Sequence, residues 1–467
     1  MSKIVERCAG IDIGKRFLLC CVVTGAAHEE SRSQTLRFDT TVPALERMSE
    51  WLHRERVTHV VMESTGSYWV PVFNILEDRF TVVLANPEEV QNRKGHKTDR
   101  KDAKHLADLL RHDHIRPSYI PPRATRELRD LTRRRVQLMQ DCTRERNRVQ
   151  KLLEHANVKI AGVLSDVFGV SGQRMLVALL EGESTPDQIA ELACGQAKRK
   201  IPQLTEALVG HRMTEHERFL IRSCLRHLAC LEEELESLDV EIVRRMGMPP
   251  FQNAFALLQT LPGVGELSAA AILAETGTDV ASFPTAAQMA SWAGLCPGNR
   301  ESAGIQKGSH TTHGNAYLRT ALVQCSWCAS RKQGSGFEAR FKRLVKPLGP
   351  KRAIVAVAHH MLIIIYCMLH LLHAPSRRII SGRRRCASAA APATSCTSSL
   401  ALSPPSGRSG AGAVGRPIRM GALNRFCYVG FQNNRHGSED ARASRERSSN
   451  PLGPEFCTGR CEMSSEA

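Results

Sequence analysis

The spacing of apolar residues over the first 120 positions predicts a sheet with helices between its later strands. Apolar runs typical of strands lie at 7–24, where two runs flank Gly14-Lys15 as in a hairpin, and at 34–40, 58–65 and 80–87. Helical spacing follows at 42–55, at 68–78 and in the run after residue 98. The order of three strands, helix, strand, helix, strand, helix predicts an α/β domain of about 120 residues.

Two long helical seams occupy the middle of the chain. In the first, positions from Leu128 to Leu152 alternate three and four apart, with Arg135 and Glu145 as polar breaks. The second runs from Ile221 to Ile242 and is more uniformly apolar. This spacing is typical of coiled coils, and the two seams could pair within one chain or with another subunit. The arginines of the first seam could line a solvated face or track phosphates.

A third unit begins near residue 257. The turn Leu261-Pro-Gly-Val-Gly265 before an alanine-rich helix fits a helix-hairpin-helix turn, whose backbone N–H groups can approach a DNA phosphate. The apolar run 353–373 has the length of a membrane span. His359 and His360 lie in its middle, so we predict a buried C-terminal helix and no membrane association.

After residue 376 the composition changes to Arg, Ala, Ser, Gly and Pro with few large apolar residues. Such a segment cannot bury a core, so residues 376–467 are expected to be disordered. Our hypothesis is that they are a frameshifted or readthrough tail.

The net charge of the chain indicates what kind of molecule it binds. The 467 residues carry a formal net charge of +17 and a pI of about 9.4, which points to nucleic acid. The N-terminus has no apolar signal-peptide core, so the sixteen cysteines are expected to be reduced thiols and the protein cytoplasmic. Cys325 and Cys328 lie in an apolar helix-like run, which is more typical of a core than of a zinc site.

Four carboxylates are the candidates for chemistry. Asp12 lies in the middle of an apolar strand, where an ionised group needs a partner or a metal. Glu63 ends a later strand, and a solvated strand end is its plainer interpretation. Asp99 and Asp102 open a helix, where they could cap its N-terminus or form half of a metal site.

Together, four acids at the ends of one sheet repel each other unless a cation joins them. Carboxylate oxygens suit Mg²⁺, and two such ions roughly 4 Å apart can clamp an in-line attack on a phosphodiester. The acids and the positive charge favour a metal-dependent polynucleotide enzyme. Ser302 lies in a polar, glycine-containing segment, and by itself it is best interpreted as an ordinary loop serine.

Several motifs resemble the DEDD transposases of the insertion-sequence family "IS one-ten". They occur in the family's order over roughly residues 5–373: GIDIGK, VVMESTGSYWVPVFNILE, GHKTDRKDAKHLADLLRH, IRPSYIPP, LPGVG, and WAGLCPGNRESAG followed by GNAYLR. The chain departs from the family at its end, where HAPSRRIISGRRRC replaces a short motif around Gly-Ala-Asp-Tyr-Phe.

The resemblance implies an RNase H-like (RuvC-like) N-terminal domain with Asp12, Glu63, Asp99 and Asp102 as its catalytic, metal-binding acids. It also implies a C-terminal transposase domain in which Ser302 attacks DNA and holds it as a phosphoserine, beside the acids of another subunit. Further implications are a structured noncoding guide RNA that pairs with donor and target DNA, and a homo-oligomer, either dimer or tetramer.

These observations predict four regions: a RuvC-like DEDD domain at 5–122, a helical coiled-coil region at 123–250, a mainly α transposase domain at 251–375, and the tail at 376–467. The predicted function is a DNA recombinase that excises and inserts its own element with Mg²⁺ and without ATP, since no Walker-type loop is visible. Two alternatives stay open: a RuvC-like junction resolvase or nuclease that uses water, and a catalytically decayed copy that still binds nucleic acid.

Overall fold

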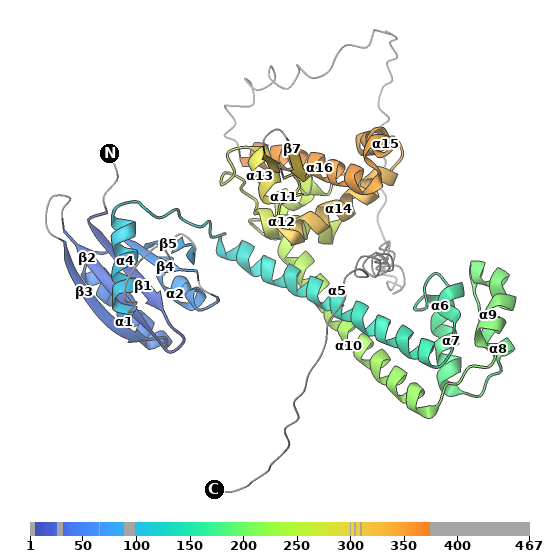
Figure 1. Cartoon of the computed structure of the whole chain (residues 1–467). Coiled ribbons are helices and arrows are strands. Elements are labelled where there is room, and N and C mark those ends of the chain that lie inside the picture. Colours follow the sequence, from blue (N-terminus) through green and yellow to red (C-terminus); the bar gives the residue numbers. More distant parts are fainter. Residues whose placement is uncertain are drawn as a thin grey trace, which may run out of the picture. The chain divides into compact units, whose positions relative to one another are not determined.

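The structure is a computed structural model that describes residues 5–25, 31–64, 66–87, 99–298, 300–302, 305–308 and 311–373 (Figure 1). The expectations for residues 376–467 lie outside this range. So do the side chains of Asp99 and Ser302, whose backbone alone is described.

The N-terminal domain is built on one mixed sheet of five strands in the order β3-β2-β1-β4-β5. The first three strands form an antiparallel meander, and β4 and β5 then run parallel to β1. The strands are β1 (Arg7–Ile13), β2 (Phe17–Thr24), β3 (Arg32–Asp39), β4 (His59–Glu63) and β5 (Thr81–Ala85). Every strand predicted from the apolar pattern is present, and the hairpin turn falls at Gly14-Lys15 as expected.

Helices cover both faces of this sheet (Figure 1). Helices α1 (Val42–Arg54) and α2 (Trp69–Leu76) lie on one side, where Ile11 and Met62 are part of their core. Helix α4 (Asp99–Arg111) covers the other side and packs on Cys8 and Val61. Because successive strand residues point to opposite faces, the central strands are apolar on both sides. This strand order, with helices on both faces, is the RNase H-like architecture, and the predicted fold class is confirmed.

The two predicted seams form α5 (Arg123–His155) and α10 (Glu215–Met246), which pack along each other within one chain (Figure 1). The polar breaks of the first seam have partners on the second. Arg135 forms an ion pair with Asp239, and Glu145 forms a hydrogen bond with His227. Of the two pairings considered, the structure shows the intramolecular one, and the polar positions hold the register of the two helices.

A small helical cap joins the far ends of α5 and α10. It has its own core, which includes Val149 and Leu153 of α5 and Ile221 of α10. The amino-acid pattern did not single out this cap inside the helical region. Its elements are α6 (Ile160–Val163), α7 (Val170–Glu181), α8 (Pro186–Glu191), the 3-10 helix η1 (Gly195–Lys200) and α9 (Ile201–Leu208).

The C-terminal part is mainly helical around a separate core. Its elements are α11 (Gln252–Leu258), α12 (Glu266–Thr276), α13 (Ala286–Trp292), the short strands β6 (Arg300–Ser302) and β7 (Ile305–Gly308), α14 (Ala316–Arg331), α15 (Gly336–Leu348) and α16 (Pro350–His373). Helix α16 is long and apolar enough to cross a membrane by length and composition. Its residues Val357, Met361 and Ile365 are fully buried in this core.

The glycine-containing turn 261–265 joins α11 to α12 as expected. One of its glycines, Gly263, is needed for the packing of α14 against the turn. Gly263 has φ +81°, and a Cβ there would lie 2.4 Å from the carbonyl oxygen of Cys325 on α14. A Cβ on Gly265 would meet no atom within 4 Å. Close packing of α14, rather than approach to a phosphate, therefore explains the glycine at 263.

Candidate active site

Asp12 and Glu63 are neighbours at the ends of two parallel strands. The register pairs Ile11 with Met62, so the next residue of each strand is the acid. Gly10 and Val61, two positions before these acids, face α4, and the alternation of side chains places the acids on that same face. Both carboxylates are half-buried. The sheet therefore brings together two acids that are 51 positions apart in the chain.

Three contacts show how α4 lies over β1. The backbone N–H of Val5 donates to the carbonyl of Arg111 at 3.1 Å, and the thiol of Cys8 lies 3.5 Å from the carbonyl of Ala107. Gly10 lies under Ala103. As β1 advances, its contacts on α4 move toward the start of the helix, so the two elements run antiparallel. Asp12 therefore lies toward the first turn of α4.

That first turn carries the other two predicted acids. Asp102 is half-buried and immediately precedes Ala103, which is fully buried against the sheet. Asp99 is the first residue of α4, one helical turn before Ala103, so its Cα is on the sheet side. The fold thus places Asp12 beside Glu63 and directs the first turn of α4 toward the same end of the sheet. Among the described side chains, no three His, Cys, Asp or Glu groups are arranged to hold a metal ion.

Ser302 lies at the end of β6, in a short hairpin where it pairs with Ile305. The base of the hairpin is held by backbone contacts. Pro297 bridges to Thr311, and the backbone N–H of Asn315 donates to the carbonyl of Trp292 at 3.2 Å. Close contact between Gly294 and Gly314 adds to this, since a Cβ on Gly314 would lie 2.2 Å from the Gly294 nitrogen.

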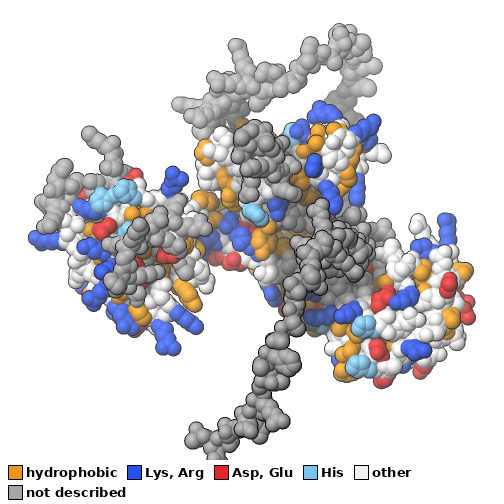
Figure 2. Space-filling model, viewed as in Figure 1, with side chains coloured by type: hydrophobic (Ala, Val, Ile, Leu, Met, Phe, Trp, Pro, Cys, Tyr) orange, Lys and Arg blue, Asp and Glu red, His pale blue; other side chains and the backbone are white. Residues whose placement is uncertain are grey.

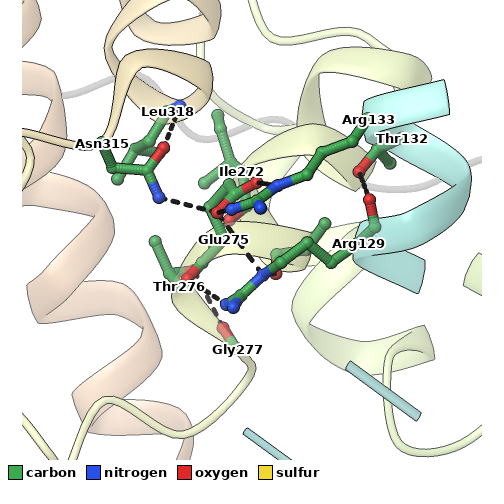
Figure 3. A network of polar contacts seen from close by, with 10 residues as sticks. Arg129, Thr132, Arg133, Ile272, Glu275, Thr276, Gly277, Asn315 and Leu318 are labelled. Carbon is green, nitrogen blue, oxygen red and sulfur yellow. Dashed lines mark hydrogen bonds and ion pairs between the residues drawn. The ribbon is translucent and has the colours of Figure 1, made fainter. Parts of the chain in front are cut away.

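A buried carboxylate that the sequence analysis did not identify supports this hairpin base (Figure 3). The side chain of Glu275, on α12, is only 2 % exposed. Arg133 donates to both of its oxygens, at 2.9 and 3.0 Å, and Asn315 donates to one at 2.7 Å. Arg129 donates to the carbonyls of Ala274 and Glu275 at 3.0 Å and completes the ion-pair cluster.

The Glu275 network connects three elements: α5, α12 and the N-cap of α14. Hydrogen bonding to the carboxylate raises the pKa of Arg133, which keeps its guanidinium charged. The signal available in the sequence was a glutamate near the C-terminal end of the apolar helix ELSAAAILAET, directly after the run AAAILA. A carboxylate in such a helix needs a cation, and the arginines of the first seam supply it.

The arginines of α5 are largely engaged inside the chain. Eight of them form ion pairs with carboxylates: Arg123, Arg126, Arg129, Arg133, Arg135, Arg144, Arg146 and Arg148. The two interpretations of this charge were a solvated face and a face that tracks phosphates; the structure shows instead that most of these arginines pair with carboxylates of the same chain.

A different surface carries unbalanced positive charge. Residues 331–352, over α15 and the start of α16, contain eight Lys and Arg and one acid, Glu338. Arg343, Lys346 and Lys351 are exposed there, and Figure 2 shows basic side chains gathered over this part. We call these three residues the α15 basic patch. Its excess charge is suited to a polyanion.

Two regions of the chain match families of known proteins. A model of the DEDD transposase family matches residues 9–158, and a model described as "Transposase IS116/IS110/IS902 family" matches residues 255–342; together they cover about half of the chain. The chain is 28 % identical over 306 residues to a 42 kDa protein of insertion element IS900 from Mycobacterium paratuberculosis, covering 60 % of this chain and 73 % of that protein.

Two further relatives and one solved structure are similar. A 43.6 kDa protein of insertion element IS110 from Streptomyces coelicolor is 26 % identical, over 58 % of this chain and 70 % of that protein. A transposase for IS1111A from Coxiella burnetii is 24 % identical, over 77 % of this chain and 88 % of that protein. RuvC of Thermus thermophilus is 17 % identical, with a TM-score of 0.20, over 24 % of this chain and 99 % of RuvC.

The RNase H-like domain, which matches the DEDD transposase model, and the mainly helical domain, which matches a second transposase model, define a transposase, an enzyme that cleaves and rejoins DNA. Nucleases of this acidic class bind DNA and use divalent metal ions. The chain belongs to the IS110 family of transposases, and the predicted family membership is confirmed.

Proposed function

We propose that this transposase excises and inserts its own insertion-sequence element by recombination, using Mg²⁺ and a serine nucleophile. One observation carries the proposal. Asp12 and Glu63 are register neighbours on the α4 face of the sheet, and the antiparallel course of α4 brings the turn that contains Asp99 and Asp102 to the same end. Acids from three separate elements point to one sheet end, and a shared cation would offset their mutual repulsion.

The donor set suits a hard divalent cation. Asp12, Glu63 and Asp102 offer carboxylate oxygens, and each is half-buried rather than fully solvated. With Asp99 they would hold Mg²⁺. When bound, the metal would polarise the scissile phosphate and stabilise the leaving oxygen. The acids themselves would fix the position of the cation at the ends of β1 and β4. The position of the cation would in turn set where the phosphate lies.

Ser302 is proposed as the nucleophile. Its Oγ would form a bond to phosphorus while the bond between phosphorus and one DNA oxygen breaks, leaving a phosphoserine and a free DNA hydroxyl. The serine proton passes to a base or to solvent, and attack by a hydroxyl of a second DNA strand reverses the step. Because the phosphodiester energy is kept in the phosphoserine, rejoining needs no ATP.

A relative's name favours rejoining over hydrolysis. A pilin gene-inverting protein of Moraxella bovis is 31 % identical over 141 residues, covering 29 % of this chain and 44 % of that protein. Inverting a gene requires that cut strands be joined again. This supports a recombinase over the nuclease or junction resolvase that releases ends with water.

The partners that we propose are DNA of the element ends and target, a noncoding guide RNA, and further copies of the chain in a dimer or tetramer. The net charge of +17 and the α15 basic patch support contacts with nucleic acid. The RNA and the oligomer rest on the motif resemblance alone. We infer a cytoplasmic protein from the polar N-terminal sequence and the cysteines expected to be reduced.

The test is recombination in cells between a donor and a target plasmid, with the element's flanking noncoding sequence supplied. The wild type is compared with Asp102→Ala, Ser302→Ala and a chain truncated after residue 376. Asp108→Ala, on α4 but away from the four proposed acids, is the matched control. We expect junctions from the wild type and the control, and none from the two site variants.

Other outcomes select the alternatives. Strand cleavage that survives in Ser302→Ala supports a nuclease that uses water. Salt-sensitive nucleic-acid binding without junctions from any version, the truncated chain included, supports a decayed copy. Equal activity of the truncated and full chains makes residues 377–467 dispensable.

A further inference from the structure

A shallow cavity of about 590 Å³, wide open to solvent, lies beside the base of the Ser302 hairpin. Its lining comes from α5, the end of α13 and the start of α14, and includes Arg133, Trp292, His313, Asn315 and Tyr317. None of these residues belongs to the acidic site on the sheet. The combination of two aromatic rings, a guanidinium and an imidazole is uncommon in a packing defect and typical of sites for flat anionic ligands.

Each of the two aromatic side chains packs against one neighbouring side chain and stays partly exposed to solvent. Trp292 packs against Phe283, with ring centroids 5.1 Å apart, yet it is 39 % exposed. Tyr317 has the Arg133 guanidinium 4.7 Å from its ring centroid and is half-buried. Each ring is thus fixed by one neighbour and still borders the cavity. A fixed aromatic surface loses little side-chain entropy when a second ring stacks on it.

Arg133 places a guanidinium at the edge of the cavity. Glu275 pairs with Arg129 and Arg133, and the carboxylate of Asp130 acts on both arginines as well, so the cluster as a whole is balanced in charge. Arg133 is the member of the cluster that borders the cavity, where its guanidinium can meet a phosphate. Two N–H groups of Arg133 donate hydrogen bonds to Glu275 (Figure 3). These bonds hold the guanidinium in one orientation before any ligand binds.

The cavity is also linked to the hairpin that carries Ser302. Trp292 accepts the backbone hydrogen bond from Asn315, and Pro297 and Thr311 bridge at the start of the hairpin. Asn315 in turn donates its side-chain amide to Glu275 at 2.7 Å. A ligand in the cavity would therefore contact the same residues that hold the hairpin base.

We propose that this cavity binds one unpaired nucleotide of the strand that Ser302 attacks, an inference that rests on the proposed function. The base stacks on Trp292 and Tyr317, and its phosphate lies beside Arg133. A base within a duplex is stacked on its neighbours and cannot enter a concave site, whereas an unpaired or flipped base can. The pocket would recognise locally unpaired DNA beside the cleaved bond.

Binding of short oligonucleotides tests this proposal without strand transfer. The full chain carrying Ser302→Ala is titrated with a fluorescein-labelled oligothymidylate of about 12 nucleotides, alone and annealed to oligoadenylate. Trp292→Ala is expected to weaken binding of the single strand about tenfold, the loss of one stacked base, and to leave duplex binding within about twofold. Trp292→Phe keeps an aromatic ring and should retain most of the affinity.

Phe219→Ala is the matched control, because Phe219 is an exposed aromatic residue on α10, remote in sequence from the cavity. A loss that is equal for single strand and duplex, a similar loss in Phe219→Ala, or no loss at all overturns the proposal. Photo-crosslinking of an iodouracil-substituted strand to the chain with Trp292 intact avoids any folding defect. Crosslinks on Trp292 or Tyr317 support the pocket, and crosslinks confined to other regions overturn it.

Different results would reject the recombinase function and the nucleotide pocket. Selective single-strand binding that depends on Trp292, in a chain that never forms junctions, keeps the pocket and rejects the recombinase. Junction formation that is lost in Ser302→Ala but unaffected by Trp292→Ala, together with unaltered oligonucleotide binding, rejects the pocket alone.

Discussion

Gly10 of β1 and Ala103 of α4 meet backbone to backbone, and a Cβ built on Gly10 would lie 2.2 Å from the carbonyl oxygen of Ala103. The same Cβ would lie 2.5 Å from the nitrogen of Ala107. Neither atom can move without shifting the helix. The contact therefore sets the height of α4 above the sheet, and with it the position of Asp99 and Asp102 relative to Asp12.

We predict that Gly10→Ala destabilises the protein by about 1–3 kcal/mol, as overpacking does, and strongly reduces recombination. Urea unfolding and the plasmid assay measure the two effects. Gly162→Ala is the control, because a Cβ there meets nothing within 4 Å, and its unfolding free energy should stay the same or rise by up to about 1 kcal/mol. An unchanged free energy in Gly10→Ala would contradict the close approach.

Replacing the buried Glu275 should be costly. Glu275→Gln removes the buried carboxylate that pairs with both Arg129 and Arg133, so we expect a loss of about 3 kcal/mol. Glu232→Gln removes an exposed partner of Arg146 and should cost less than about 1 kcal/mol. Denaturant unfolding of both variants decides whether the network is more than a surface ion pair; equal losses would show that it is not.

The α15 basic patch should make nucleic-acid binding depend on salt. Each phosphate contact contributes about 0.9 to the slope of log K against log salt on a duplex. The double variant Arg343→Gln, Lys346→Gln should therefore bind a duplex with a slope lower by about 2. The pair Lys198→Gln, Arg199→Gln removes the same charge from η1, and it should leave the slope nearly unchanged. Equal effects of the two doubles would mean that only net charge matters.

His359 and His360 on α16 should make stability fall in mild acid. Burial lowers the pKa of both, with Arg340 adding to the effect. Below their ordinary pKa of about 6.5 the unfolded chain binds protons that the folded chain resists. Stability is therefore fully present above about pH 6.5 and declines as the pH drops below it.

The measurement is the denaturation midpoint between about pH 7.5 and 5, compared with a His359→Gln, His360→Gln variant. The variant should show a shallower decline, even if its stability at pH 7.5 is lower. An identical pH dependence in the two proteins would place the acid sensitivity elsewhere.

The Cys-x-x-Cys pair on α14 should react unequally. Burial raises the pKa of Cys325 to about 11, while Cys328 is exposed. Since the thiolate is the nucleophile, iodoacetamide at neutral pH should label Cys328 and spare Cys325 in the folded protein. Mass spectrometry of the labelled peptides provides the result, and unfolding in guanidinium should make both residues reactive. Equal labelling in the folded state would contradict the burial of Cys325.

Local pattern was a good guide to the elements of the N-terminal domain. Each strand from β1 to β5 is a short apolar run between polar turns, and such runs have few other ways to bury both faces. The helical spacing of Ala103, Leu106 and Leu110 likewise predicted the buried face of α4. The seams of α5 and α10 were recognised because their apolar residues also recur at helical spacing. Their pairing was left open because a heptad pattern does not specify which helix it packs against.

The site depended on contacts between distant residues. The sequence by itself determined the candidate acids, since Asp12 in an apolar strand demands an explanation, and the motifs identified the family that joins it to Glu63, Asp99, Asp102 and Ser302. Only the tertiary structure placed Asp12 beside Glu63 and turned α4 so that its first turn reaches them. Only the tertiary structure showed that Glu275 holds Arg133 beside Trp292 and Tyr317. Ion pairs between residues more than a hundred positions apart arise from the packing of helices, and local spacing does not encode that packing.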